Sequence, residues 1–218
     1  MVLRKGENLV ILGKSGTGKS VTIKCMVGLI QQDSGELKVF DQDINAMPEK
    51  EVKELRKRIG FLFQSSALYD SMTVRENLEF PLKRILAIKD KSELDEKVAE
   101  ILKSVSLPDT ADKMPSELSG GMRKRIGLAR TLIVKPEIML YDEPTTGLDP
   151  ITSKEISELI LTVQKDYGIS SVIITHDIAC ARITANRVLV MSEGKFIAEG
   201  TIEEIENSAD PMIKSFFK

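Results

Sequence analysis

The stretch that decides the fold is Gly13-Lys14-Ser15-Gly16-Thr17-Gly18-Lys19-Ser20. It fits the pattern G-x-x-x-x-G-K-[ST], in which glycines let the backbone curl so that several N–H groups converge on phosphate oxygens. Lys19 supplies a mobile positive charge for the β- and γ-phosphates, and Ser20 supplies a hydroxyl for Mg²⁺. A glycine-rich turn with a solvated lysine is the alternative, but the segments on either side disfavour it. The stretch therefore predicts a site for a nucleoside triphosphate.

Short apolar runs alternate with amphipathic stretches on both sides of this loop. Residues 8–12 are predicted to form a strand that enters the loop, and residues 20–30 a helix that leaves it. Continuous apolar strands that alternate with helices are typical of a mostly parallel sheet covered on both faces. The sequence therefore predicts a single α/β domain over residues 1–218. The other expected strands are 36–40, 59–63, 138–141, 171–175 and the hairpin 188–191 with 196–198, and a further helix is expected at 153–164.

The segment from about residue 69 to residue 118 differs in character from the rest. It is charged and helix-favouring, and Leu94, Val98, Ile101, Leu102 and Val105 are spaced to form one apolar helix face. No low-complexity linker borders it. We therefore expect an inserted α-helical subdomain within the α/β domain.

Composition narrows the function classes. The chain has 42% hydrophobic and 29% charged residues and a formal net charge of −2, which excludes collagen-like and disordered classes and disfavours nucleic acid as a partner. There are only 10 aromatic residues (7 Phe, 3 Tyr and no Trp) to stack on bases. The basic cluster of Arg123, Lys124, Arg125 and Arg130 is accordingly interpreted as a solvated helix face. No apolar stretch reaches the roughly 20 residues that cross a bilayer.

Two acidic residues end the apolar run 138–141. Asp142 is placed where it can hold Mg²⁺ through water, as a hard cation prefers. Glu143 can polarise a water molecule for attack on the γ-phosphorus as a general base. A capping or turn pair before Pro144 is the alternative for these two residues alone.

A second glycine motif, Leu118-Ser119-Gly120-Gly121-Met122, opens another predicted helix. A small hydroxyl residue followed by two glycines leaves free N–H groups at a helix N-terminus, which is a second site for an anion. The motif resembles the signature of ATP-binding-cassette (ABC) ATPases. Gln64 after a strand, Thr146-Gly147-Leu148-Asp149 after Glu143, and His176 after a strand stand in the order of that family.

The resemblance implies a P-loop NTPase fold of the RecA-like type, ATP and Mg²⁺ as cofactors, and ATP hydrolysis by a head-to-tail dimer. It implies that His176 contacts the γ-phosphate and orients the water, and that Gln64 contacts Mg²⁺ and that water. Asp149 is then expected to communicate across the dimer interface. The implied nucleotide-binding residues are Gly13, Lys14, Ser15, Gly16, Thr17, Gly18, Lys19, Ser20, Val21, Ser119, Gly120, Gly121 and Asp149, with Ser20, Gln64 and Asp142 at the metal.

Several stretches are similar to a narrower group, the ATPases of Mla/Mce-type lipid transporters. These are residues 15–21, 61–82, 121–125, 140–144 and 210–217. This similarity implies a homodimer on the cytoplasmic face of a bacterial inner membrane, with a separate permease and a membrane-anchored lipid-binding protein as partners. The alternatives are another ABC importer, for example of amino acids, a cell-division ABC complex, or a soluble ABC protein that acts on DNA or ribosomes.

The sequence before the first predicted strand is short. Met1 stands close before Lys5-Gly6-Glu7, whereas members of the family carry a leading segment that supplies edge strands and an aromatic residue for the adenine. We therefore expect a reduced N-terminal antiparallel part, no adenine-stacking aromatic residue, and a start that is truncated relative to the family.

Overall fold

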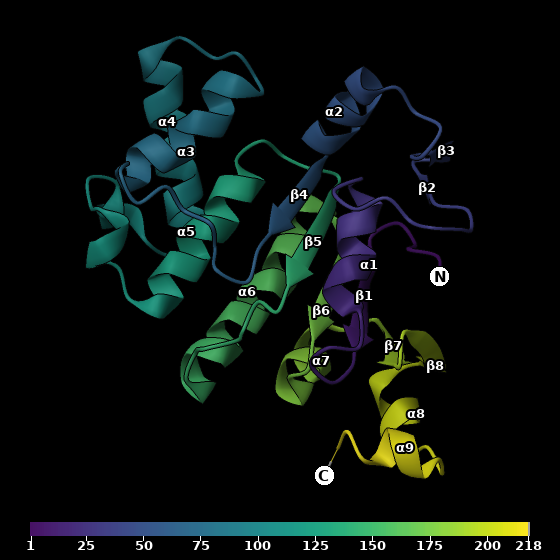
Figure 1. The fold of residues 1–218 in the computed structure, drawn as a ribbon. Coiled ribbons are helices and arrows are strands. Elements are labelled where there is room, and N and C mark those ends of the chain that lie inside the picture. Colours follow the sequence, from purple (N-terminus) through teal and green to yellow (C-terminus); the bar gives the residue numbers. More distant parts are fainter. Residues whose placement is uncertain (218) are drawn as a thin grey trace.

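The structure is a computed structural model that describes residues 1–217 (Figure 1). The strands are β1 (Asn8–Leu12), β2 (Lys38–Val39), β3 (Gln42–Asp43), β4 (Ile59–Leu62), β5 (Ile138–Asp142), β6 (Ser170–Thr175), β7 (Arg187–Ser192) and β8 (Lys195–Gly200). The helices are α1 (Lys19–Met26), α2 (Glu49–Lys57), α3 (Val74–Arg84), α4 (Lys91–Ser104), α5 (Gly120–Leu132), α6 (Pro150–Tyr167), α7 (Ile178–Thr184), α8 (Ile202–Glu206) and α9 (Pro211–Lys214).

The main sheet has six strands in the order β4-β5-β6-β1-β7-β8. Its neighbours pair in parallel except for β7 and β8, which form an antiparallel hairpin. Strands β2 and β3 form a separate two-stranded antiparallel sheet. The mostly parallel sheet, the closing hairpin and the small antiparallel part were all expected and are confirmed.

Apolar side chains of the sheet alternate between two covered faces. Val10 and Leu12 of β1 belong to a cluster with residues of α5, α6 and α7, whereas Ile11 belongs to a cluster with Ile23 and Met26 of α1. Figure 1 accordingly shows the sheet between α1 on one side and α6 and α7 on the other. Since every residue of β1 is buried, the strand that enters the phosphate loop is held at the centre of the molecule.

Helix α1 ends at Met26, four residues before the predicted end. Gly28 has a φ of 63°, its N–H donates to Cys25 O at 2.8 Å, and Leu29 N–H donates to Lys24 O at 2.9 Å. This is the Schellman motif that glycine favours just beyond a helix. The prediction of a helix to residue 30 was wrong because Gly28 terminates it.

The predicted strand 36–40 is also shorter in the structure. Only Lys38 and Val39 pair with a partner strand. Phe40 and Asp41 then adopt left-handed backbone conformations with φ of 52° and 63°, so that the chain turns into β3.

The helix-favouring segment contains α3 and α4, followed by short 3₁₀ turns at Pro108–Thr110 and Pro115–Glu117. Thr73 caps α3 through a reciprocal pair of hydrogen bonds with Glu76. Leu78 of α3 and Val98 of α4 belong to the same apolar cluster as α5 and α6. The segment is therefore packed onto the α/β core, and its independence as a subdomain stays a prediction.

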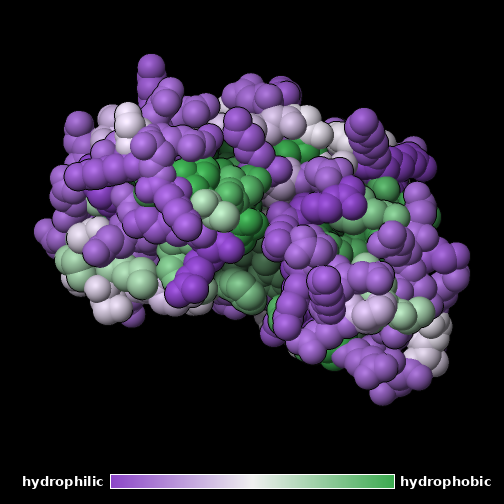
Figure 2. Space-filling view, turned by 90° about the horizontal axis from the view of Figure 1, so that it is seen from above, coloured by the Kyte–Doolittle hydropathy of each residue, from purple (hydrophilic) through white to green (hydrophobic). Residues whose placement is uncertain are grey.

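The surface of this segment and its surroundings is seen in Figure 2 from above. Hydrophilic side chains dominate this face, and hydrophobic residues gather in a few patches. Some of them lie in the hollow that divides the outline of the molecule in this view. Within residues 1–217 no helix has the length and apolar character needed to cross a membrane.

Candidate functional site

Four loops that carry predicted site residues follow neighbouring strands. In the sheet order β4-β5-β6-β1, Gln64 follows β4, Glu143 follows β5, His176 follows β6, and Gly13 begins the loop after β1. Parallel strands bring their carboxyl ends to one edge, where open α/β sheets bind their ligands. The topology thus brings together residues that lie up to 163 positions apart, from Gly13 to His176.

The loop of residues 13–20 makes a tight turn over the start of α1. Gly16 and Gly18 have φ of 82° and 97°, in the region that favours glycine. A side chain at Gly13 would meet Met191 O at 2.7 Å, so a close approach of two backbones also requires glycine there. No side chain caps α1, so its first N–H groups remain available to a phosphate.

The loop lysine lies inside this turn. Lys19 is 5% exposed, and its Nζ donates to Gly13 O at 2.7 Å and to Lys14 O at 3.0 Å. A third contact, at 3.3 Å, joins Nζ to Oε1 of Glu143. The cation is therefore shared between the phosphate loop and the acidic residue after β5. Val21, also predicted at the nucleotide, is exposed on the first turn of α1.

The predicted magnesium residues Ser20 and Asp142 meet directly. Ser20 Oγ donates to Asp142 Oδ1 at 2.7 Å, and the carboxylate is 7% exposed. A hydroxyl and a carboxylate are hard oxygen donors, and Mg²⁺ typically uses one or two of them together with waters and substrate phosphates. Residues 1–217 hold no cluster of three or more His, Cys, Asp or Glu side chains that could cage a metal without a substrate. This donor set therefore fits Mg²⁺ held with a nucleotide.

Glu143 lies at the centre of the site. Its backbone has a φ of 49°, which is uncommon for a residue with a side chain. Oε2 accepts from His176 Nδ1 at 2.8 Å and from Thr146 Oγ1 at 3.3 Å. The carboxylate is thus oriented by groups from two loops while Lys19 neutralises it. The alternative of a simple turn pair does not describe these contacts.

His176 and Gln64 flank that carboxylate. The His176 side chain is 51% exposed, so one face of the ring stays open to a ligand. Gln64 is exposed after β4, next to β5 in the sheet, and its backbone C=O accepts a hydrogen bond from Lys124 Nζ.

The interpretation of the basic cluster as a solvated face was wrong for Lys124. This residue is 4% exposed, and burial lowers the pKa of its ammonium group to about 8 although Asp142 and Glu143 oppose the shift. Arg130 is also partly buried, and its Nη1 donates to Ala67 O at 2.6 Å. Arg123 is exposed as predicted. Lys124 lies three residues before the buried Gly127, on the same face of α5.

The signature residues open α5 at the surface. Ser119 is the N-cap, and its hydroxyl accepts from Met122 N at 3.2 Å. A Cβ at Gly121 would overlap Cγ2 of Thr152, so α5 and α6 pack closely here. Asp149 caps α6 by accepting from Thr152 N and Ile151 N at 3.0 Å each, and the hydrogen bond from the Thr152 hydroxyl lowers the pKa of this carboxyl. Asp149 thus lies beside the signature of its own chain.

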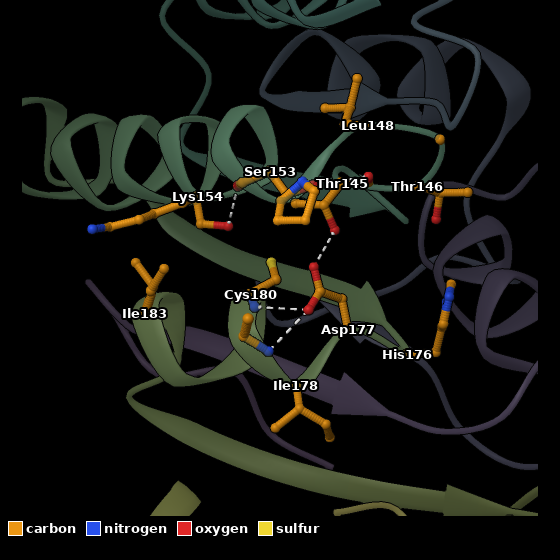
Figure 3. Close-up of a pocket in the computed structure, with 14 residues that line it drawn as sticks. Thr145, Thr146, Leu148, Ser153, Lys154, His176, Asp177, Ile178, Cys180 and Ile183 are labelled. Carbon is orange, nitrogen blue, oxygen red and sulfur yellow. Dashed lines mark hydrogen bonds between the residues drawn. The ribbon is translucent and has the colours of Figure 1, made fainter.

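A cleft of about 650 Å³ adjoins the site between α6 and α7 (Figure 3). His176 and Thr146 lie at one end, and Ile183 and Lys154 at the other. Asp177 lies between them and accepts from Thr145 Oγ1 at 2.9 Å, which joins the loop after β5 to the start of α7. The cleft lies beside the phosphate loop and includes none of residues 13–20.

Comparisons with known proteins agree with this geometry. Residues 1–146 match the family model described as ABC transporter. Two solved structures are similar. The dimeric ATP-binding cassette MJ0796 in a post-hydrolysis state with ADP and Pi has a TM-score of 0.83 and 31% sequence identity, and the match covers 93% of this chain and 88% of that one. The structure of cbiO1 from Clostridium perfringens, part of the ABC transporter complex cbiONQ, has a TM-score of 0.87 and 30% identity, and the match covers 100% of this chain and 86% of that one.

Curated relatives include the methionine import ATP-binding proteins of Bacillus thuringiensis subsp. konkukian (MetN 1, 40% identity over 93% of this chain) and Rhizobium johnstonii (MetN, 39% over 93%). The chain spans 59% and 55% of their lengths. Their names refer to methionine import, so the expected closeness to Mla/Mce-type lipid ATPases is not supported. Since the family match covers well over half of the sequence, and solved cassettes align along most of their length, the chain belongs to the ABC transporter family.

Proposed function

We propose that this chain binds ATP with Mg²⁺ and hydrolyses it as the ATP-binding subunit of an ABC importer. The observation that carries the hydrolytic part is the position of Glu143. Its carboxylate is 2.8 Å from His176 Nδ1 and 3.3 Å from Lys19 Nζ, at the sheet edge where Ser20 and Asp142 form the magnesium donor pair.

In this proposal the residues divide the work of phosphoryl transfer to water. Residues 13–21 would bind the phosphates through N–H groups and Lys19, while Ser20, Asp142 and Gln64 would hold Mg²⁺, which would supply positive charge to the phosphate oxygens. Glu143 accepts the proton of the attacking water as general base. His176 orients that water and the γ-phosphate, and the hydrogen bond from its ring fixes the rotamer of Glu143.

We propose a head-to-tail homodimer as the working unit. Ser119 and Gly120 are exposed at the N-terminus of α5, where N–H groups and the helix dipole favour an anion. In a head-to-tail dimer, this exposed helix N-terminus can bind the phosphates of the ATP that is bound to the phosphate loop of the second copy. The similar cassette MJ0796 is dimeric with ADP and Pi. Asp149 is then placed to report on that interface, because its loop packs beside the signature.

For the solute we propose an amino acid, with methionine as the first candidate, rather than a phospholipid. The support is the printed function of relatives that are 39–40% identical over most of this chain. The partner is an integral-membrane permease, and the ATPase works at the cytoplasmic face of the bacterial inner membrane.

Hydrolysis is tested with Glu143→Gln, which keeps the shape of the side chain and removes the base. We expect kcat for Mg²⁺-dependent phosphate release to fall by about 10²–10³-fold, within the range for loss of general base catalysis, while ATP still binds. The matched control is Glu96→Gln, at an exposed glutamate of α4 that forms no ion pair with any of residues 1–217. If Glu143→Gln retains wild-type turnover, the assigned base is wrong.

The solute is tested by reconstituting the chain with its co-purifying permease in proteoliposomes. ATP-driven accumulation of labelled methionine, absent with Glu143→Gln, is the expected result. Transfer of a fluorescent phospholipid without methionine uptake would instead favour lipid transport and refute the importer proposal.

A further inference from the structure

Lys124 connects three elements of the candidate site. It lies on α5, the helix opened by the signature, and its Nζ donates to the backbone C=O of Gln64 and, at 3.5 Å, to that of Glu143. It is 4% exposed, so these contacts are made away from water, where a charge-assisted hydrogen bond is strong. One cation therefore holds the loops after β4 and β5 against one helix.

The same face of α5 contacts the rest of the loop after Gln64. Gly127 lies one turn further, and a Cβ there would meet Ser66 Cβ at 2.8 Å. Arg130 donates to Ala67 O at 2.6 Å. Ser66 and Ala67 have φ of 63° and 47°, conformations that residues with side chains adopt only when their surroundings hold them there.

We propose that Lys124 is a positioning residue for ATP hydrolysis, which ties the backbones of Gln64 and Glu143 to the signature helix so that the three keep a fixed relative geometry. The inference rests on the proposed hydrolytic function. Lys124 does not reach the nucleotide in this role, because it acts through backbone carbonyls. A lysine that only filled the interior would stabilise the fold without affecting turnover per folded molecule.

The test replaces the donor while keeping the length of the side chain. For Lys124→Met we expect kcat for ATP to fall at least about tenfold, with KM for ATP and the Kd of a fluorescent ATP analogue within about twofold of wild type. Lys124→Arg, which keeps donors and charge, should restore kcat to within about threefold. Lys103→Met, at an exposed lysine near the end of α4, is the matched control and should behave as wild type.

Hydrogen exchange supplies a readout that does not require activity. Lys124→Met should speed amide exchange in residues 63–68 and leave α4 unchanged. An unchanged kcat, a rise in KM alone, failure of Lys124→Arg to rescue, or unchanged exchange in residues 63–68 would each overturn the inference. If Lys124→Met does not fold, Lys124→Gln, which keeps an amide donor but loses the charge, replaces it, and its kcat should lie below that of Lys124→Arg because a neutral donor forms weaker hydrogen bonds. A wild-type protein without ATPase activity would refute the proposed function. Amide exchange in residues 63–68 would still test whether Lys124 holds this loop against α5.

Discussion

Replacing Gly121 by alanine should destabilise the protein through a single contact. A Cβ atom at this position would overlap Cγ2 of Thr152, at the crossing of α5 and α6. The backbone of Gly121 is helical, so alanine brings no conformational strain of its own. The clash is therefore separable from backbone effects, and removal of the Thr152 methyl group should relieve it.

The magnitude follows from two opposing contributions. Forcing one methyl group into a packed crossing costs about 1–3 kcal/mol. Alanine is a better helix former than glycine by at most about 1 kcal/mol, so Gly121→Ala alone should lower the free energy of unfolding by about 1 kcal/mol. Thr152→Ser keeps the hydroxyl that donates to Asp149 Oδ2 at 2.5 Å and loses a half-buried methyl group worth about 0.5 kcal/mol.

The double variant should then be about 0.5 kcal/mol more stable than wild type, because the clash is relieved and the helix propensity of alanine is retained, which corresponds to a coupling energy of about 2 kcal/mol between the two positions. Urea unfolding of the four proteins, followed by circular dichroism, measures this cycle. The packing argument is refuted if Gly121→Ala alone is neutral or if the two effects simply add. ATPase assays on the double variant would separate packing from the proposed anion site, because restored stability without restored turnover requires a role for the glycine beyond this contact.

Two further predictions concern stability. Glu7→Gln should lower the free energy of unfolding by about 2 kcal/mol at neutral pH, because Arg187 loses one of its two carboxylate partners and keeps Glu199. Removing one partner of a fully buried ion pair costs more, roughly 3–5 kcal/mol. Since the hydrogen bond from Arg187 holds the pKa of Glu7 below its ordinary 4.5, urea unfolding should show this difference unchanged above about pH 5 and shrinking as the pH falls below about 4.5. A difference that does not shrink below about pH 4.5 would contradict the assignment. Leu78→Ala, at a fully buried position of α3, should cost about 3 kcal/mol and lower Tm by about 6–12 °C in calorimetry, in one transition because its cluster is continuous with the core. A separate early transition would show that the helical segment melts alone.

Local patterns predicted the parts of the site that local geometry determines. The phosphate loop needs glycines where φ is positive, and Gly16 and Gly18 have such values. The strand that precedes Asp142 is apolar because it is buried on both faces, so its end could be located within one residue. Lone His176, by contrast, had no local signal, and only the family order placed it near Glu143.

Contacts between distant segments account for what the sequence did not show. The burial of Lys124 depends on Gln64, 60 residues earlier, and on Glu143, 19 residues later, and no periodicity within α5 encodes those partners. A cluster of basic residues on one predicted helix is usually solvated. Here Lys124 donates hydrogen bonds to two backbone carbonyls instead of to water, and both carbonyls belong to segments distant from α5 in the sequence.

The similarity to lipid-transport ATPases was misleading for a physical reason. Three of the stretches that carried it form the phosphate loop, the signature helix and the end of β5. These elements carry the residues predicted to bind and hydrolyse ATP. Similarity within them therefore reflects the shared chemistry of ATP hydrolysis and does not identify a transported solute.

The contacts of Lys19 suggest how nucleotide binding and the proposed base are linked. Its ammonium donates hydrogen bonds to Gly13 O and Lys14 O and forms an ion pair with Glu143 Oε1 at 3.3 Å. A phosphate oxygen that approaches this cation competes with these three oxygens for it. Loss of either carbonyl would open the turn that forms the cradle, whereas loss of Glu143 leaves the turn intact. We therefore expect the arrival of the γ-phosphate to weaken the Lys19–Glu143 ion pair and to free the carboxylate toward water and His176.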